Sequence, residues 1–218
     1  MSNEVKIIAG ISVITLVLVV GAAFMFGGSS SSAQSGKPIS NTQALVRSDS
    51  HEINAHSKVT LVEFGDFQCP ACGAEYPIIT QLLQAYNGKI NFVFRDFPLP
   101  QHQNAQAAAE AAEAAGAQGK FFEMYNMLYT NQSTWGETTN AMDYFTQYAK
   151  ALRLDMNKWT SDVKSEKYKN KIQKDINDGY AVSVNATPTF FLNGVAIEGG
   201  LPYNDFKAKI DDAIKKAS

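Results

Sequence analysis

The most hydrophobic stretch of the chain lies at its N-terminus, over residues 7–26. It contains no charged side chain, and its only hydroxyl groups are those of Ser12 and Thr15. A helix of this length spans roughly 30 Å, the thickness of the hydrocarbon core of a bilayer. We therefore expect a transmembrane anchor at residues 7–26, with residues 1–6 in the cytoplasm because Lys6 flanks the stretch on that side. A cleaved signal peptide is the alternative, and both interpretations export the rest of the chain.

Polar residues dominate the following stretch, residues 27–57, which we interpret as a linker and an N-terminal extension. Residues 27–36 are almost all Gly and Ser, a composition typical of flexible linkers. The pattern is weak elsewhere in this stretch. Around Thr42–Val46 it allows either a short helix or an edge strand.

A strand–helix–strand pattern begins at residue 58. Residues 59–64 are β-branched and apolar enough to form a buried strand, and residues 90–94 repeat this pattern. Between them, residues 72–86 carry apolar side chains at helical spacing, with Pro77 predicting a kink. Such a unit is expected to be a right-handed crossover that joins two parallel strands.

Helical patterns fill the next eighty or so residues. Four helices are expected, of which the first is rich in alanine and the second in aromatic residues. Their expected ranges are 105–117, 121–129, 139–152 and 155–180. Asp155 is well suited to cap the start of the last one.

The sheet pattern then resumes. Residues 189–192 and 195–197 read as two strands, and Asn193-Gly194 between them is a strong hairpin signal. A final amphipathic helix is expected over residues 203–216. The order of elements predicts an α/β protein that resembles the thioredoxin fold with an inserted all-helical domain. We assign residues 58–98 and 181–218 to the thioredoxin-fold domain and residues 99–180 to the helical insert.

Composition and charge exclude some classes of function. The formal net charge is −2 and the pI is about 5.9, so the chain has no basic excess that would favour nucleic acid. The chain has two cysteines, three positions apart. Two cysteines are too few for a disulfide-stapled scaffold in a chain of 218 residues. We expect no nucleic-acid partner, no metal and no separate cofactor.

The cysteine pair carries the main chemical signal. Cys69-Pro70-Ala71-Cys72 follows a predicted strand and opens a predicted helix. At a helix N-terminus, unpaired N–H groups and the helix dipole stabilise a thiolate, and Pro70 fits the first turn because its missing N–H has no partner there. We therefore expect a redox-active pair in which Cys69 attacks and Cys72 resolves.

Two other interpretations of this pair are a structural zinc site and inert core cysteines. A structural zinc site normally needs four protein ligands, and the three histidines offer none at comparable spacing. Inert core cysteines are the other alternative. The strand–motif–helix context favours redox chemistry over both.

Glu63 and Arg95 form a second candidate group. Glu63 precedes Cys69 by six residues on the strand beneath the motif, and Arg95 closes the neighbouring strand. If the two side chains meet, they form an acid–base pair able to relay protons during exchange. The alternative leaves the Glu63 carboxylate in solvent at a strand end.

Three segments resemble the DsbA family of bacterial thiol oxidases, and the resemblance covers roughly residues 58–217. They are residues 63–72, residues 97–102 and residues 187–194. The resemblance implies a *cis* peptide bond at Pro188, with Pro188 packed against the disulfide and Thr187 in contact with the sulfurs. The alternative for Pro188 alone is a *trans* proline that starts an edge strand.

The resemblance also implies a function. Such proteins donate a disulfide to unfolded exported proteins and are reoxidised by a quinone-linked membrane thiol oxidase, so we expect a monomeric, membrane-anchored protein with an extracytoplasmic catalytic domain. One position departs from the family: Ala71 stands where a histidine is frequent, which should raise the pKa of Cys69 and make the protein a milder oxidant. The role of His102, which matches a family pattern, is left open. A reductase or isomerase of the same fold, or a tethered peptide-binding chaperone, are the alternative functions.

Overall fold

The computed structural model describes residues 38–197 and 199–217. The predicted anchor at residues 7–26 and the cytoplasmic residues 1–6 lie outside these residues, as does the linker up to residue 37. Within the described part, no helix is both long and apolar enough to cross a membrane.

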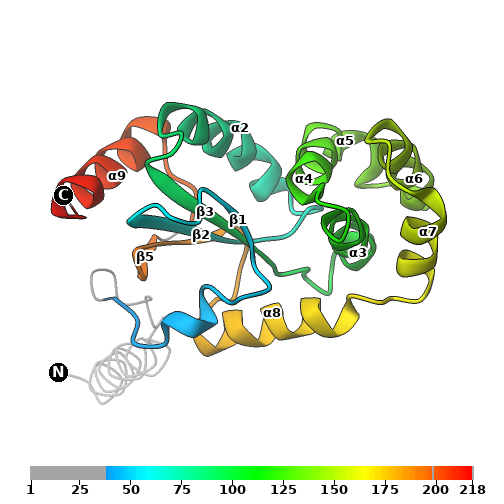
Figure 1. Cartoon of the computed structure of the whole chain (residues 1–218), viewed down its shortest axis with the longest axis horizontal. Helices are drawn as coiled ribbons and strands as arrows, with labels where there is room; N and C mark the ends of the chain where they lie inside the picture. The colour runs from blue at the N-terminus through cyan, green and yellow to red at the C-terminus, as the bar shows by residue number, and fades with distance from the viewer. Residues whose placement is uncertain (1–37, 198, 218) are drawn as a thin grey trace, which may run out of the picture. The chain divides into compact units, whose positions relative to one another are not determined.

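A mixed five-stranded sheet forms the centre of the fold (Figure 1). Its strands follow the order β1-β3-β2-β4-β5, with β2 and β3 parallel and every other neighbouring pair antiparallel. The strands are β1 (His51–Ile53), β2 (Val59–Gly65), β3 (Ile90–Asp96), β4 (Thr189–Leu192) and β5 (Val195–Ile197). The predicted parallel pair and the predicted hairpin at Asn193-Gly194 are both confirmed, whereas β1 lies in the extension where no strand was placed.

Helices cover both faces of the sheet. Helices α2 (Pro70–Ala85) and α9 (Tyr203–Ala217) lie on one face, and α8 (Lys169–Ala181) lies on the other (Figure 1). Side chains alternate between two separate hydrophobic clusters: Leu61 and Phe92 pack on the α2 side, while Val62 and Val93 pack on the α8 side. A β2 or β3 residue therefore faces one cluster or the other according to its position along the strand.

The helical region lies beside the sheet. It contains α3 (Ala105–Gly116), α4 (Phe121–Thr130), α5 (Gln132–Trp135), α6 (Ala141–Ala151) and α7 (Met156–Lys164). Helix α3 is buried on nearly all sides and contacts α4, α6, α7 and α8. Its alanines suit this position because small side chains allow close approach of the surrounding helices.

One predicted helix was wrong, and one short helix was missed. The single helix expected over residues 155–180 is two helices, because the chain turns at Ser165–Tyr168, where Glu166 adopts a positive φ of 48°. This turn lets α8 leave the helical region and pack against β3 and a short 3-10 helix at Thr42–Ala44, which occupies the weakly patterned segment. The short helix α5 was not predicted at all. Asp155 does cap α7, accepting hydrogen bonds from the N–H groups of Asn157 and Lys158.

Candidate active site

The cysteine motif lies where β2 ends and α2 begins. Cys69 is the N-cap of α2, Pro70 is its first residue, and Ala71 completes the turn before Cys72. Both cysteines are free thiols. The exposed fraction is 6% for Cys69 and 1% for Cys72, so Cys69 is the sulfur that solvent and substrates can reach.

The surroundings shift the pKa values of the two thiols in opposite directions. The pKa of Cys69 falls from 9.0 to about 5, chiefly through its hydrogen bond with Cys72, helped by Thr187 and by the backbone N–H groups of Cys72 and Ala71, and opposed by burial. The pKa of Cys72 rises well above 9.0 because it is buried, and the hydrogen bond with Cys69 and the charge of Glu63 add to this. Cys69 is thus the thiolate at neutral pH and Cys72 the protonated thiol.

The loop before β4 closes the other side of the sulfurs. The Thr187–Pro188 peptide bond is *cis*, as the resemblance implied. The protonated Cys69 thiol donates to the carbonyl oxygen of Thr187 at 3.3 Å. Thr187 is buried, and its hydrogen bond with the Cys69 sulfur helps to lower the pKa of Cys69.

Glu63 lies beneath the cysteines, fully buried on the α2 side of the sheet, with a relative exposure of 1%. The hydroxyl of Tyr125, in α4, donates to its Oε2 at 3.4 Å. Burial is the largest cause that raises the pKa of Glu63 to about 8, and the charges of Glu75 and Cys69 contribute, against the hydrogen bond from Tyr125. At neutral pH this carboxyl group is therefore mostly protonated, beside the buried thiol of Cys72.

The predicted pairing of Glu63 with Arg95 does not occur. In the parallel register Glu63 lies opposite Phe94, whereas Arg95 lies opposite Phe64, so the two side chains project from opposite faces of the sheet. Arg95 instead bonds Asp175 and Asp178 of α8, at 2.9 and 2.7 Å between its Nη2 and their carboxylate oxygens. It is a structural residue on the α8 side, and Glu63 is left with Tyr125.

Several residues that position the motif were missed. Asp66 is buried and accepts from the N–H of Gln68 at 2.7 Å and of Leu99 at 2.8 Å, while His102 Nδ1 lies 2.6 Å from its Oδ2. His102 thus holds the loop that leads into the motif. An acidic residue directly after a buried strand was a readable signal for Asp66, but nothing in the sequence indicated Gln132, whose side chain reaches this loop from α5.

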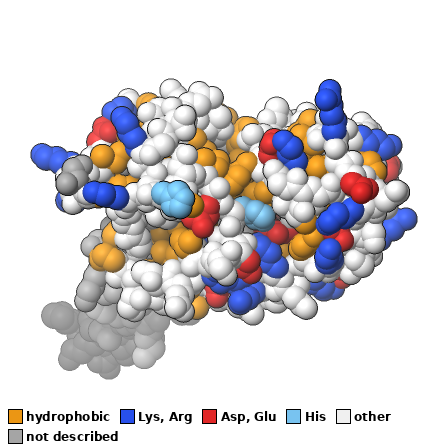
Figure 2. Space-filling view, viewed as in Figure 1, with side chains coloured by type: hydrophobic (Ala, Val, Ile, Leu, Met, Phe, Trp, Pro, Cys, Tyr) orange, Lys and Arg blue, Asp and Glu red, His pale blue; other side chains and the backbone are white. Residues whose placement is uncertain are grey.

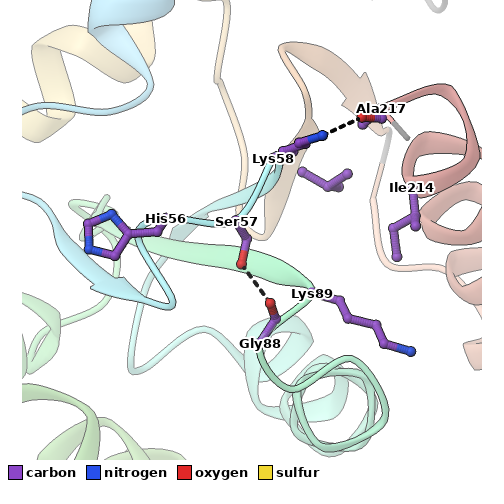
Figure 3. Close-up of a pocket in the computed structure, with 8 residues that line it drawn as sticks. His56, Ser57, Lys58, Gly88, Lys89, Ile214 and Ala217 are labelled. Carbon is purple, nitrogen blue, oxygen red and sulfur yellow. Dashed lines mark hydrogen bonds between the residues drawn. The ribbon is translucent and has the colours of Figure 1, made fainter.

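A hollow of about 300 Å³ lies at the opposite end of the sheet, lined by residues 56–59 and 88–89 and by the end of α9 (Figure 3). Lys58 Nζ donates to the carbonyl oxygen of Ala217, and Ser57 Oγ donates to that of Gly88, each at 3.2 Å. These bonds join the chain segments that meet there. The seven-residue strand β2 separates this hollow from the cysteines by about 20 Å, so it is not part of the site. In the described part of the chain, no group of three or more His, Cys, Asp or Glu side chains could hold a metal ion.

Glu63→Gln should change how stability depends on pH. Because the pKa of Glu63 is about 8 when folded and near 4.5 when unfolded, the folded state holds one more proton between these values, and stability falls as pH rises through that window. Relative to the wild type, the variant should gain up to roughly 1 kcal/mol per pH unit from pH 5 to 8. Urea unfolding of the disulfide form, in which neither cysteine titrates, measures this. Glu166→Gln, at a glutamate that is 58% exposed, is the control; parallel pH profiles for Glu63→Gln and the wild type would show that Glu63 titrates normally.

Comparison with known proteins places this site in a family. A family model described as thioredoxin matches residues 53–212. The chain therefore belongs to the thioredoxin family. Within it, the chain is homologous to DsbA-like thiol–disulfide oxidoreductases.

Relatives by sequence are of two kinds. The chain is 27% identical over 164 residues to the "Probable disulfide bond formation protein D" of *Bacillus cereus*, covering 72% of this chain and 75% of that protein. It is 38% identical over 156 residues to the "Na(+)/H(+) antiporter NhaA 1" of *Salinispora arenicola*, covering 71% of this chain and 23% of the antiporter. The chain thus spans about a quarter of the length of the antiporters that it matches.

Solved structures share the fold. The alpha-DsbA1 of *Wolbachia pipientis* superposes with a TM-score of 0.73 at 19% identity, covering 82% of this chain and 98% of that one. The oxidised BdbD of *Bacillus subtilis* superposes with a TM-score of 0.70 at 22% identity, covering 84% and 98%. At these identities the likeness establishes the thioredoxin-like fold with its helical region.

Proposed function

We propose that this protein is an extracytoplasmic thiol–disulfide oxidase that donates the Cys69–Cys72 disulfide to exported proteins. The observation that supports this most is the asymmetry of the pair. A thiolate of low pKa at Cys69 stabilises the reduced form, which favours donation of the disulfide to a substrate. The name of the *Bacillus cereus* relative, a disulfide bond formation protein, agrees with this direction of transfer.

The proposed reaction has two exchange steps. A substrate thiolate attacks Sγ of Cys69, a mixed disulfide forms, and the bond to Cys72 breaks with its electron pair going to the Cys72 sulfur. That sulfur takes a proton, for which protonated Glu63 is the nearby source. A second substrate thiolate then attacks the substrate sulfur of the mixed disulfide, and Cys69 leaves as a thiolate. The substrate loses two electrons, and the cysteine pair gains them without a separate cofactor.

The setting of the reaction is also a proposal. We expect residues 7–26 to anchor the protein to a membrane with its catalytic domain outside the cytoplasm. Its substrates would be unfolded exported proteins, and a quinone-linked membrane thiol oxidase would restore the disulfide. One of the structural neighbours is titled a periplasmic thioredoxin-like protein, from *Salmonella enterica*, which supports an extracytoplasmic location. The described face in Figure 2 carries small separate groups of hydrophobic side chains among charged ones, which suits brief contact with many chains.

Disulfide transfer tests the proposed direction. The oxidised full chain should transfer one disulfide per molecule to reduced, unfolded ribonuclease A, as counted by alkylation of the remaining thiols. A matched reaction with the reduced chain should transfer none. Catalysed reduction of insulin disulfides by a thiol donor, without transfer to ribonuclease A, would overturn the oxidase proposal and identify a reductase. Peptide binding that survives Cys69→Ser, with no transfer, would indicate a chaperone.

A further inference from the structure

The side chain of Gln132 reaches the cysteine loop from the helical region. Its Nε2 donates two hydrogen bonds of 2.8 Å, one to the carbonyl oxygen of Phe67 and one to that of Cys69. Gln132 is the first residue of α5. The amide group therefore holds both ends of the segment that carries the attacking cysteine.

Gly73 makes room for this amide group. A Cβ atom at position 73 would lie 2.2 Å from Oε1 of Gln132 and 2.8 Å from its Cδ, so any larger residue there displaces the side chain. Glycine in a helix is ordinarily less stable than alanine by about 0.5–1 kcal/mol. Gly73, one residue after the motif, therefore lowers the stability of the helix but leaves space for the side chain of Gln132.

A second contact reinforces the first on the neighbouring residue. Gln68 Nε2 donates to the carbonyl oxygen of Gly136 at 2.6 Å, and its Oε1 accepts from the N–H of Asn104 at 2.6 Å. Asn104 in turn donates to the carbonyl oxygen of Gly136 at 3.2 Å. Both polar atoms of the Gln68 side chain therefore bind the helical region, which holds the loop from Phe67 to Cys69 against it.

The backbone of Cys69 decides where its sulfur points. Cys69 has an extended conformation, with φ −64° and ψ 121°, while its carbonyl accepts the first helical bond from Gly73 at 3.0 Å. In this arrangement, the N–H groups of Ala71 and Cys72 hydrogen-bond the sulfur. Rotation of the peptide group after Cys69 would turn the sulfur away from them, and the hydrogen bond from Gln132 opposes that rotation.

We propose that Gln132 is a positioning residue through which the helical region controls the geometry and reactivity of Cys69. The inference deepens the proposed function, because it rests on Cys69 being the attacking sulfur. It gives the helical region a role in the chemistry of the pair that is separate from substrate contact.

Two substitutions test this proposal, one in Gln132 itself and one in Gly73, which leaves space for its side chain. Gln132→Ala removes both hydrogen bonds, and Gly73→Ala displaces the same amide group while improving helix propensity. Each should raise the pKa of Cys69 by about one unit, a roughly tenfold loss of thiolate below that pKa. The double variant should show no further rise, because both changes remove one interaction. The ultraviolet absorbance of the thiolate, followed against pH in the reduced full chain, measures the pKa without any substrate.

Gln118→Ala is the matched control. Gln118 also makes two hydrogen bonds within the helical region, both to the backbone of Asp155, at 3.2 and 2.8 Å. It should lower stability as Gln132→Ala does but leave the pKa of Cys69 unchanged. If Gln132→Ala and Gly73→Ala leave that pKa unchanged too, or if their effects add in the double variant, the proposal is wrong. A shifted pKa together with absent transfer to ribonuclease A would support the positioning role and overturn the oxidase function instead.

Discussion

Cys72→Ser should convert the protein into a trap that accumulates mixed disulfides with its partners. Cys69 remains able to attack a disulfide, but without a second sulfur at position 72 nothing within the protein can release the adduct. Net oxidation of a dithiol becomes impossible, so disulfide transfer should be lost completely. Incubation with oxidised ribonuclease A, followed by non-reducing electrophoresis and mass spectrometry, should show the adduct on Cys69.

Cys69→Ser is the matched control for this experiment. It should abolish both transfer and adduct formation, because the remaining thiol of Cys72 is only 1% exposed and its pKa is raised well above 9.0. Adducts that form on Cys72 in this variant, and not on Cys69 in the other, would reverse the roles of the two cysteines.

Arg95→Met should have the largest effect on stability. The guanidinium group is 1% exposed and donates to Asp175, itself 1% exposed, and to the carbonyl oxygens of Ala44 and Leu45 at 2.8 and 2.9 Å. Its removal leaves a buried carboxylate without its main partner, for which we expect a loss of about 3–5 kcal/mol in the free energy of unfolding. Denaturant titration measures this. Lys169→Ala, which removes a pair exposed by 63% and 58%, should change the free energy of unfolding far less, because water screens an exposed pair.

The same substitution tests the register of the central strands. Because Arg95 projects to the α8 side and Glu63 to the α2 side, Arg95→Met should leave the pKa of Cys69 unchanged under conditions where the variant is folded. Should Arg95→Met abolish folding, Arg95→Lys provides the milder version: it keeps the charge but has fewer donors for the same acceptors. A large shift in the pKa of Cys69 with unchanged stability would place Arg95 beside Glu63, contrary to the structure.

Local patterns predicted most of the elements because each carried its own signal. The β-branched run of β2, the Asn193-Gly194 turn and the Asp155 cap depend on residues within a few positions of each other. The division between α7 and α8 was missed for the opposite reason. Residues 155–180 are helical by composition throughout, and the turn at Glu166 is selected by the packing of α8 against β3.

The site residues, too, fall into those that the local sequence predicted and those that only tertiary contacts decided. Cys69, Pro70, Ala71 and Cys72 could be assigned from the sequence, since their chemistry follows from their place at the start of a helix, and Pro188 with Thr187 followed from the family resemblance. Glu63 was predicted as a site residue, but its predicted partner was wrong. The sequence placed Glu63 and Arg95 on neighbouring strands and did not reveal that Arg95 projects from the other face of the sheet. Tyr125, from α4, holds that place instead.

The sequence by itself therefore predicted a thioredoxin-like chain with a redox-active cysteine pair, because a strand, a Cys-Pro-Ala-Cys motif and a helix start are contiguous. Only the tertiary structure decided what surrounds that pair. The pKa of Glu63, the hydrogen bonds from Gln132 and the space provided by Gly73 each depend on residues about sixty positions away along the chain. The motif lowers the pKa of Cys69 through Cys72 and the N–H groups of Ala71 and Cys72, and the fold adjusts that pKa through burial and Thr187, because both act through space.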